Sequence, residues 1–215
     1  MARLSGPDTA RWHALAGRVA AVVERSLSPR VVANRAVGGG RGWSLEPVGP
    51  ALRRTRSLAR AAFGSSPLLR TDVAAFYPSV TAPVAFSSLR RVGADPGDAM
   101  EAADLLEGWG NEGYPGLPVG PPASAVLANA VLASVDDVLA ARRFVRWVDD
   151  YLIPVPSERA ASEVTERLDD ALDRLGLNRS EPKTLVTEGG VVWAGTTLPS
   201  PGGAVPPAPA RIAAP

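Results

Sequence analysis

The chain has 215 residues, a formal net charge of +1, no cysteine and a single histidine, His13. This composition excludes a disulfide framework, a thiolate metal site and any site built from several histidines of this chain. No apolar run approaches the roughly 20 residues that a membrane span needs, and the amino terminus lacks the pattern of a secretion signal, so we expect a cytoplasmic protein with one compact core and no membrane partner.

The charge is distributed unevenly along the chain. Residues 1–70 contain 12 basic and 3 acidic residues, a net charge of +9, whereas residues 71–215 contain 11 basic and 19 acidic residues, a net charge of −8. A basic segment of this kind is typical of a surface that follows a phosphate backbone. Solvated charges in an arginine-rich chain explain the same numbers, so charge alone leaves nucleic-acid binding open.

In the first third of the chain the sequence predicts two helices separated by a loop-rich stretch. Trp12, Leu15, Val19 and Val22 recur at helical spacing and predict an amphipathic helix of about four turns. Residues 28–50 are rich in glycine and proline, which predicts a loop with short strands at 29–37 and near Trp43. We expect a second helix at 50–63 and a buried strand at 68–76.

The rest of the chain predicts more helices and two hairpins. We expect helices at 84–92, 97–109 and 122–139, a Gly/Pro-rich turn at 113–122, and a helix from Ser157 that Gly176 ends. Residues 144–154 read as two strands joined tightly at Asp149 and Asp150, and 183–186 with 189–198 as a last hairpin. The Pro/Ala/Gly-rich segment 199–215 is expected to be disordered.

Three aspartates are the strongest clue to function. Asp149 and Asp150 lie within an apolar strand-like run, and Asp72 lies near the end of another. An ionised carboxylate in such a place costs several kcal/mol unless something compensates it. Hard oxygen ligands suit Mg²⁺ or Mn²⁺, and two such ions roughly 4 Å apart are used for phosphoryl and nucleotidyl transfer.

Several stretches, in this order, resemble the palm of reverse transcriptases, particularly bacterial enzymes of the retron, group II intron and phage-defence kinds. They are Thr71 to Val80, Gly116 to Asn129, Arg146 to Asp150, Leu175 to Thr184 and Val191 to Thr196. The resemblance implies an α+β fold: a polymerase palm with a mostly antiparallel sheet and flanking helices. It implies a helix and reduced, basic fingers in 1–70 and the palm in 71–198. The family normally continues into a helical thumb, but this chain ends soon after the stretch that resembles the primer grip, so we expect no thumb.

The resemblance also implies roles for individual residues. Asp72, the Val73 carbonyl, Asp149 and Asp150 would hold two metal ions, and Lys183, the only lysine, would approach the triphosphate and donate a proton to pyrophosphate. The residues expected to contact nucleotide or template are Phe76, Tyr77 as a steric gate against a 2′-hydroxyl, Gly120, Ser124, Asn129, Arg35 and Arg41. Alternatively, Phe76 and Tyr77 belong to the core, Ser124 is a helix cap and Asn129 a packed polar residue.

The function that this resemblance implies is RNA-directed DNA polymerisation: two Mg²⁺ ions, an RNA template, a DNA primer and dNTPs. An associated RNA or protein would supply the clamp that a thumb provides. Two alternatives stay open, namely a non-polymerising nucleic-acid-binding or scaffold subunit with the same fold, and an untemplated or protein-primed nucleotidyltransferase.

Overall fold

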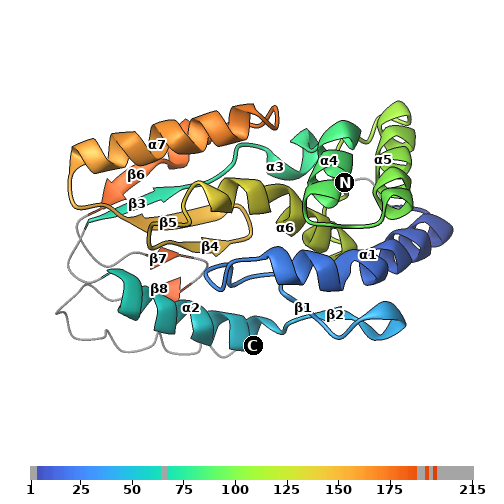
Figure 1. Cartoon of the computed structure of the whole chain (residues 1–215), viewed down its shortest axis with the longest axis horizontal. Coiled ribbons are helices and arrows are strands. Elements are labelled where there is room, and N and C mark those ends of the chain that lie inside the picture. Colours follow the sequence, from blue (N-terminus) through green and yellow to red (C-terminus); the bar gives the residue numbers. More distant parts are fainter. Residues whose placement is uncertain (1–3, 64–66, 188–191, 194–195, 198–215) are drawn as a thin grey trace, which may run out of the picture.

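The computed structural model describes residues 4–63, 67–187, 192–193 and 196–197, and it has the expected α+β fold with antiparallel sheets. Helices surround a central four-stranded sheet (Figure 1). The elements before the sheet are α1 (Gly6–Ser26), β1 (Ala36–Val37), the 3-10 turn η1 (Gly40–Gly42), β2 (Ser44–Leu45) and α2 (Val48–Phe63). Those that follow are β3 (Leu68–Thr71), α3 (Phe76–Ser79), α4 (Ala82–Arg91), α5 (Pro96–Asn111), α6 (Pro122–Asp137), β4 (Val145–Trp147), β5 (Asp150–Pro154), α7 (Glu158–Asp173), the 3-10 turn η2 (Glu181–Lys183), β6 (Leu185–Thr187), β7 (Val192–Trp193) and β8 (Thr196–Thr197).

The central sheet has the strand order β4-β5-β3-β6, and each neighbouring pair is antiparallel. Thr71, the last residue of β3, pairs with Tyr151 in β5. Trp147 pairs with Asp150 across the tight turn between β4 and β5. The carboxyl end of β3 and the β4–β5 turn therefore lie at the same end of the sheet.

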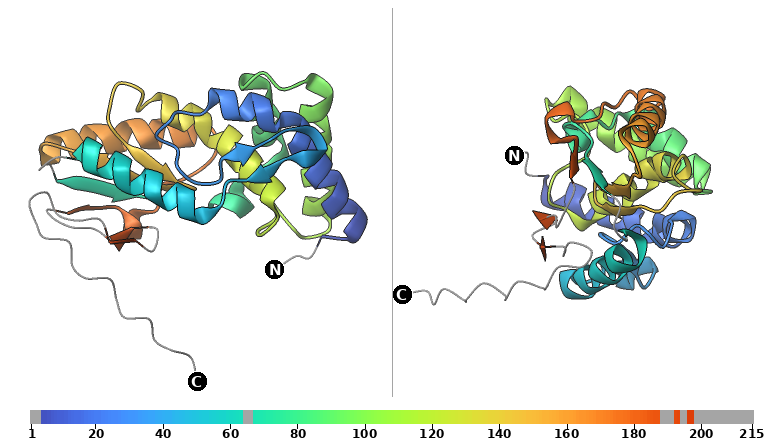
Figure 2. Two further views of the ribbon diagram at one scale, coloured as in Figure 1. Left: turned by 90° about the horizontal axis from the view of Figure 1, so that it is seen from below. Right: turned by 90° about the vertical axis from the view of Figure 1, so that its left-hand side faces the viewer.

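Helices cover both faces of the sheet (Figure 2). Because side chains alternate along a strand, Tyr151 and its neighbours Arg146 and Thr71 point to one face. On that face the Tyr151 hydroxyl donates to Asp136 of α6. Val145 and Leu152, which are fully buried, point to the other face, and α2 contacts β4 and β5.

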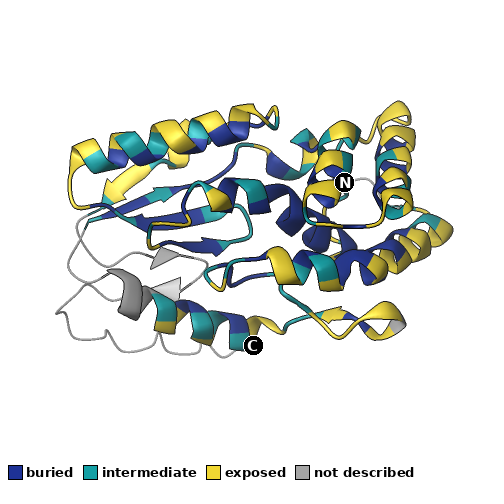
Figure 3. Cartoon of the chain, viewed as in Figure 1, coloured by how far each residue is buried: buried dark blue, intermediate teal, exposed yellow. Residues whose placement is uncertain are grey.

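The helix α6 is the centre of the helical layer (Figure 3). Nearly every residue from Ala123 to Val135 is buried, as expected of a helix that is apolar on all sides. The helices α1, α4 and α7 pack around it. Trp12 of α1 donates its indole N–H to the Ser124 hydroxyl of α6 over 3.0 Å. Residues 1–70 and the sheet-bearing part of the chain therefore share one hydrophobic core.

Three local predictions were wrong in detail. The strand expected at 68–76 ends at Thr71, since Ala75 takes a left-handed conformation with φ of 44° and α3 begins at Phe76. The strand expected at 29–37 is reduced to β1, because the chain turns at Asn34, where φ is 58°. The hairpin expected from 183–186 with 189–198 is replaced by two separate pairings: β6 joins β3 in the central sheet, and β7 pairs with β8.

The predicted tail, 199–215, lies outside the described residues. Within the described ranges, no helix combines the length and the apolar character that crossing a bilayer requires.

The Trp12–Ser124 hydrogen bond should be measurable as a coupling energy. Trp12→Phe leaves the Ser124 hydroxyl unpaired in the core, and Ser124→Ala leaves the Trp12 N–H unpaired, so each should lower the free energy of unfolding by roughly 1–3 kcal/mol. The double variant has neither the hydroxyl nor the indole N–H, so neither is left without a partner. Its decrease in the free energy of unfolding should therefore be smaller than the sum of the two single decreases by about 1 kcal/mol. Urea unfolding measures all three; strictly additive losses would show that the two groups are not bonded.

Candidate functional site

The structure brings the three predicted carboxylates to one end of the central sheet. Asp72 directly follows β3, Asp149 lies in the β4–β5 turn, and Asp150 begins β5. Since Thr71 pairs with Tyr151, Asp72 follows at the position next to Asp150 in an antiparallel register. The charge of Asp72 contributes to the raised pKa of both Asp149 and Asp150.

The surroundings of this cluster disfavour negative charge. Burial is the main cause of the raised pKa of Asp149; the charges of Asp72 and Asp150 add to it, while its own backbone N–H and Lys183 oppose it. Burial also raises the pKa of Asp150. The positive charge of Arg70, whose Nη2 lies 3.6 Å from Oδ1 of Asp150, opposes this increase. The site therefore has an excess of negative charge that a cation would relieve.

Lys183 supplies part of that compensation. Its ammonium group forms an ion pair with Oδ2 of Asp72; the lysine side chain is 62% exposed and the aspartate side chain 4%. This contact raises the pKa of Lys183. The chain after β3 pairs with the segment before η2, where Ala74 donates to the Asn178 carbonyl and Ser180 donates to the Asp72 carbonyl, each over 2.8 Å. This pairing brings Lys183 to Asp72.

Arg179 fixes the segment that carries Lys183, and the sequence analysis missed it. Its guanidinium binds both carboxylate oxygens of Asp169 in α7, at 2.8 and 3.1 Å, and donates to the Thr184 hydroxyl over 2.8 Å. The Thr184 hydroxyl lies 2.7 Å from that of Thr71 at the end of β3. Arg179 thus connects α7, the end of η2 and, through Thr184, the end of β3. No sequence motif predicts these contacts.

The donor set fits a divalent cation, but the carboxylates do not form a ready-made cage. Oδ1 of Asp72 is buried and has no hydrogen-bond partner in the described part of the chain, which leaves a hard oxygen available as a ligand. The two backbone hydrogen bonds that pair Val73 with Arg179 are made by the Asp72 carbonyl and the Ala74 N–H. The Val73 carbonyl, an expected metal ligand, takes part in neither of them. Among the described residues, no group of three or more His, Cys, Asp or Glu side chains is arranged to hold a metal ion.

Tyr77 lies beside this cluster, whereas Phe76 belongs to the core. Burial, with a further contribution from the charge of Asp149, raises the pKa of Tyr77 to about 12. The phenol is therefore protonated at neutral pH. Phe76 is buried and meets Tyr77 edge to face, with ring centroids 5.6 Å apart. The expectation that Phe76 contacts substrate is not supported, because its ring packs inside the protein.

The Gly/Pro-rich loop packs directly on α3. Leu117 donates its backbone N–H to the Tyr77 carbonyl over 2.8 Å. Gly116 has φ of 77°, and a Cβ atom there would overlap the Tyr77 carbonyl and the Pro78 backbone. Gly120 has φ of 114°, but it is exposed and has open space around it. The glycine at 116 is therefore required by close approach as well as by conformation.

Three residues expected to contact nucleotide or template are bonded inside the protein instead. Ser124 is buried against Trp12, and Asn129 is buried and donates to the Asn34 carbonyl over 3.0 Å. Arg35 pairs with Glu24 and donates to the carbonyls of two residues of the preceding loop, Ser28 and Val31. Ser124 and Asn129 are enclosed because α6 is buried on all sides, whereas Arg35 is held by its contacts with Glu24 and the two carbonyls. The side chain of Arg41 lies outside the described part of the structure.

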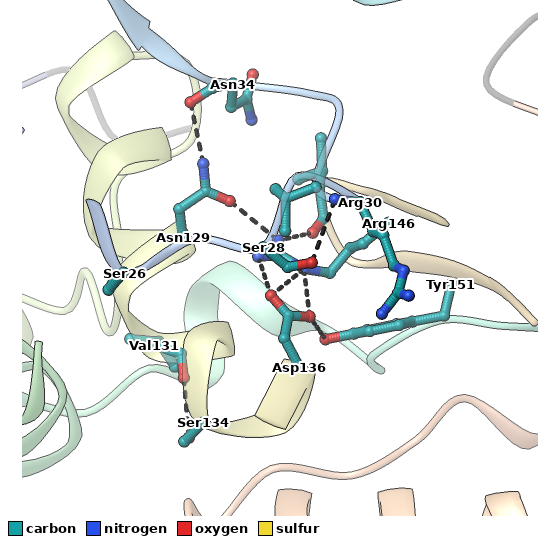
Figure 4. A network of polar contacts seen from close by, with 12 residues as sticks. Ser26, Ser28, Arg30, Asn34, Asn129, Val131, Ser134, Asp136, Arg146 and Tyr151 are labelled. Carbon is teal, nitrogen blue, oxygen red and sulfur yellow. Dashed lines mark hydrogen bonds and ion pairs between the residues drawn. The ribbon is translucent and has the colours of Figure 1, made fainter. Parts of the chain in front are cut away.

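Arg146 is the second residue whose importance the sequence analysis missed. Its side chain is 0% exposed and binds Asp136 and Asn129 (Figure 4). It also donates to the Val148 carbonyl. The sequence carries one signal for it, namely an arginine inside the apolar run Phe144-Val145-Arg146-Trp147. A charge in the middle of a buried strand requires a buried partner.

The two loop glycines provide a matched pair of stability tests. Gly116→Ala and Gly120→Ala both force alanine to a positive φ, at roughly 1–3 kcal/mol each. Only Gly116→Ala also drives a Cβ atom into backbone, which should cost roughly 1–3 kcal/mol more. Chemical denaturation should therefore rank Gly116→Ala as the less stable variant; equal losses would show that the loop does not press on α3.

Asp149→Asn should change how stability depends on pH. A carboxyl group whose pKa is raised in the folded state stabilises the fold while protonated, and that contribution is lost as pH rises through the folded-state pKa. The variant lacks this loss, so its melting temperature relative to wild type should rise between about pH 4 and pH 7. Thermal melts without divalent metal, at several pH values, measure the difference; a constant or falling difference would contradict the assigned burial and repulsion.

No protein-family model matches the chain, and no curated protein matches its sequence.

Proposed function

We propose that this chain is an RNA-directed DNA polymerase that adds dNTPs to a primer 3′-hydroxyl. One observation carries the proposal: Asp72, Asp149 and Asp150 meet at one end of an antiparallel sheet, with Lys183 on Asp72. This is the arrangement that the resemblance to reverse transcriptases implies. An α+β fold alone would support many activities, so the argument rests on the site.

The residues that would hold metal ions are Asp72, Asp149, Asp150 and the Val73 carbonyl. Two Mg²⁺ ions, or Mn²⁺ in their place, would supply activation of the primer hydroxyl and stabilisation of charge on the phosphates. The raised pKa values of Asp149 and Asp150 and the unbonded Oδ1 of Asp72 support this assignment.

Lys183 and Tyr77 would act on the nucleotide. Lys183 stays protonated, and its exposed side chain leaves it room to exchange Asp72 for the triphosphate, where Nζ would donate a proton to the leaving pyrophosphate. Tyr77, half-buried and close to Asp149, would exclude a 2′-hydroxyl and so favour dNTPs.

The phosphate contacts assigned to Arg35 need other residues, because Arg35 is bonded internally. Arg53 and Arg56 are exposed on α2, the helix that contacts β4 and β5. They are the better candidates to meet an RNA template and DNA primer. An additional RNA or protein would complete the clamp, and we place the reaction in the cytoplasm.

A second candidate function has an observation in its favour. The described residues contain no preformed three-carboxylate metal group, and Lys183 already neutralises Asp72. Both findings suit a non-polymerising subunit that binds nucleic acid or serves as a scaffold. Untemplated or protein-primed synthesis is the third; it differs from the proposal in the need for a template or in the source of the hydroxyl group that is extended.

Primer extension separates these functions. We expect wild type to extend a DNA primer on an RNA template with Mg²⁺ and labelled dNTPs, and Asp149→Ala to incorporate none. The variant should melt at or above the wild-type temperature, since the removed carboxylate is disfavoured in the folded state. Asp137→Ala, which removes an exposed aspartate of α6, is the control and should stay active.

Each contrary outcome has a definite meaning. Incorporation by Asp149→Ala would refute the site assignment. Failure of folded wild-type protein to extend the primer would favour the non-polymerising subunit. Equal incorporation without template would favour untemplated synthesis.

A further inference from the structure

The buried side chain of Arg146 connects α6 to the turn that carries Asp149. Nε and Nη2 donate to the two carboxylate oxygens of Asp136, each over 2.8 Å. Nη1 donates to Oδ1 of Asn129 over 2.9 Å and to the Val148 carbonyl over 2.6 Å. Figure 4 shows Asp136 and Asn129 joined to Arg146 by these hydrogen bonds. A single planar cation therefore satisfies a carboxylate, an amide and a backbone carbonyl.

Packing alone does not require an ion pair at this position. Arg146 and Asp136 are both buried, and taking two charges out of water costs free energy that apolar side chains of similar volume would avoid. Apolar residues would also join β4 to α6. What they could not provide is the hydrogen bond to the Val148 carbonyl, so that bond distinguishes the arginine from an ordinary core residue.

The turn needs an external constraint. Val148 has φ of 58°, a left-handed conformation that β-branched residues rarely adopt. Such backbone strain persists only where the surroundings hold it, and it is common at functional sites. The peptide whose carbonyl Arg146 binds is the one that joins Val148 to Asp149. The orientation of this peptide decides where the Asp149 side chain begins.

The network also reaches the amino-terminal part of the chain. Asn129, which accepts from Arg146, donates through Nδ2 to the Asn34 carbonyl over 3.0 Å. Tyr151 in β5 donates its hydroxyl to Asp136. The two α6 side chains that bind Arg146 are thus held in turn by β5 and by the loop before β1, which restrains the guanidinium beside the turn.

We propose that Arg146 is a positioning residue: by binding the Val148 carbonyl it holds the β4–β5 turn in the strained conformation that directs the Asp149 carboxylate toward Asp72. This rests on the proposed function, since it assigns the purpose of that orientation to the binding of divalent metal. Asp136 and Asn129 hold the guanidinium, and neither they nor Arg146 touches the metal or the nucleotide.

The test replaces the ionic network by an apolar one. The variant Arg146→Met/Asp136→Leu/Tyr151→Phe removes both charges and the hydroxyl that would otherwise lose its acceptor, so no polar group of these three side chains stays buried unpaired. The readout is the Mg²⁺ concentration that gives half of the Mg²⁺-induced rise in melting temperature. We expect this concentration to increase roughly 10- to 100-fold relative to wild type. An unchanged value in a folded variant would overturn the proposal, because a purely structural role leaves metal binding intact.

Arg146→Lys serves if the triple variant does not fold. Lysine can still pair with Asp136, but one ammonium group cannot match the several fixed contacts of the guanidinium, so the same weakening of Mg²⁺ binding is expected. Arg91→Met is the matched control: Arg91 pairs with the adjacent α6 carboxylate, Asp137, in a solvent-exposed ion pair. It should leave the Mg²⁺ dependence unchanged, and a comparable weakening there would overturn the proposal.

Primer extension on the same proteins separates this inference from the proposed function. If wild type binds Mg²⁺ in the thermal assay but extends no primer, the polymerase function fails while the thermal comparison still decides the role of Arg146. If wild type shows no Mg²⁺-dependent rise, there is no metal to position, and the inference fails whatever the extension assay shows.

Discussion

The antiparallel pairing of β3 with β5 is the constraint on which the site depends. Thr71 opposite Tyr151 makes Asp72 and Asp150 neighbours, although 77 positions separate them along the chain. A shift of β3 by one residue against β5 would turn Thr71 away from the face that Tyr151 occupies and would take Asp72 away from the face of Asp150. Burial of Leu69 and Ile153, which also pair, opposes such a shift. The β3–β5 register thus determines both which side chains are buried in the core and which carboxylates lie side by side.

The electrostatics follow from that geometry. Burial and mutual repulsion raise the pKa of Asp149 and Asp150, so the folded chain carries a site that favours a cation. Without metal, Lys183 supplies one positive charge to Asp72 from a position that remains exposed. Arg146 contributes in another way, because it is buried behind the turn and bonded to Asp136. The Lys183 ammonium group is thus free to move away from Asp72, whereas the Arg146 guanidinium is fixed behind the turn.

The burial of α6 explains why Ser124 and Asn129, which were expected to contact nucleotide or template, are bonded inside the protein. Residues at this helix resemble a nucleotide-facing motif in sequence, but α1 packs across it and the Ser124 hydroxyl accepts from Trp12. Asn129 accepts a hydrogen bond from Arg146 and so helps to hold the guanidinium beside the β4–β5 turn. We therefore infer that this stretch affects the site through the position of the β4–β5 turn. Gly116 places the loop before α6 against the Tyr77 carbonyl.

The sequence by itself determined the main helices, the β4–β5 hairpin and the candidate carboxylates. These depend on local signals: helical spacing around Trp12, the apolar run that contains the aspartate pair, and the proline that opens α6 at 122. Only the tertiary structure decided that β6 joins β3 and that Ser124, Asn129 and Arg35 are bonded internally. It also decided that Arg146 binds the Val148 carbonyl and that Arg179 binds Asp169 and Thr184. Each of these outcomes depends on which distant group supplies a partner for a buried polar atom or an open strand edge. Spacing along the chain carries no information about such a choice, because it is made when the elements pack together.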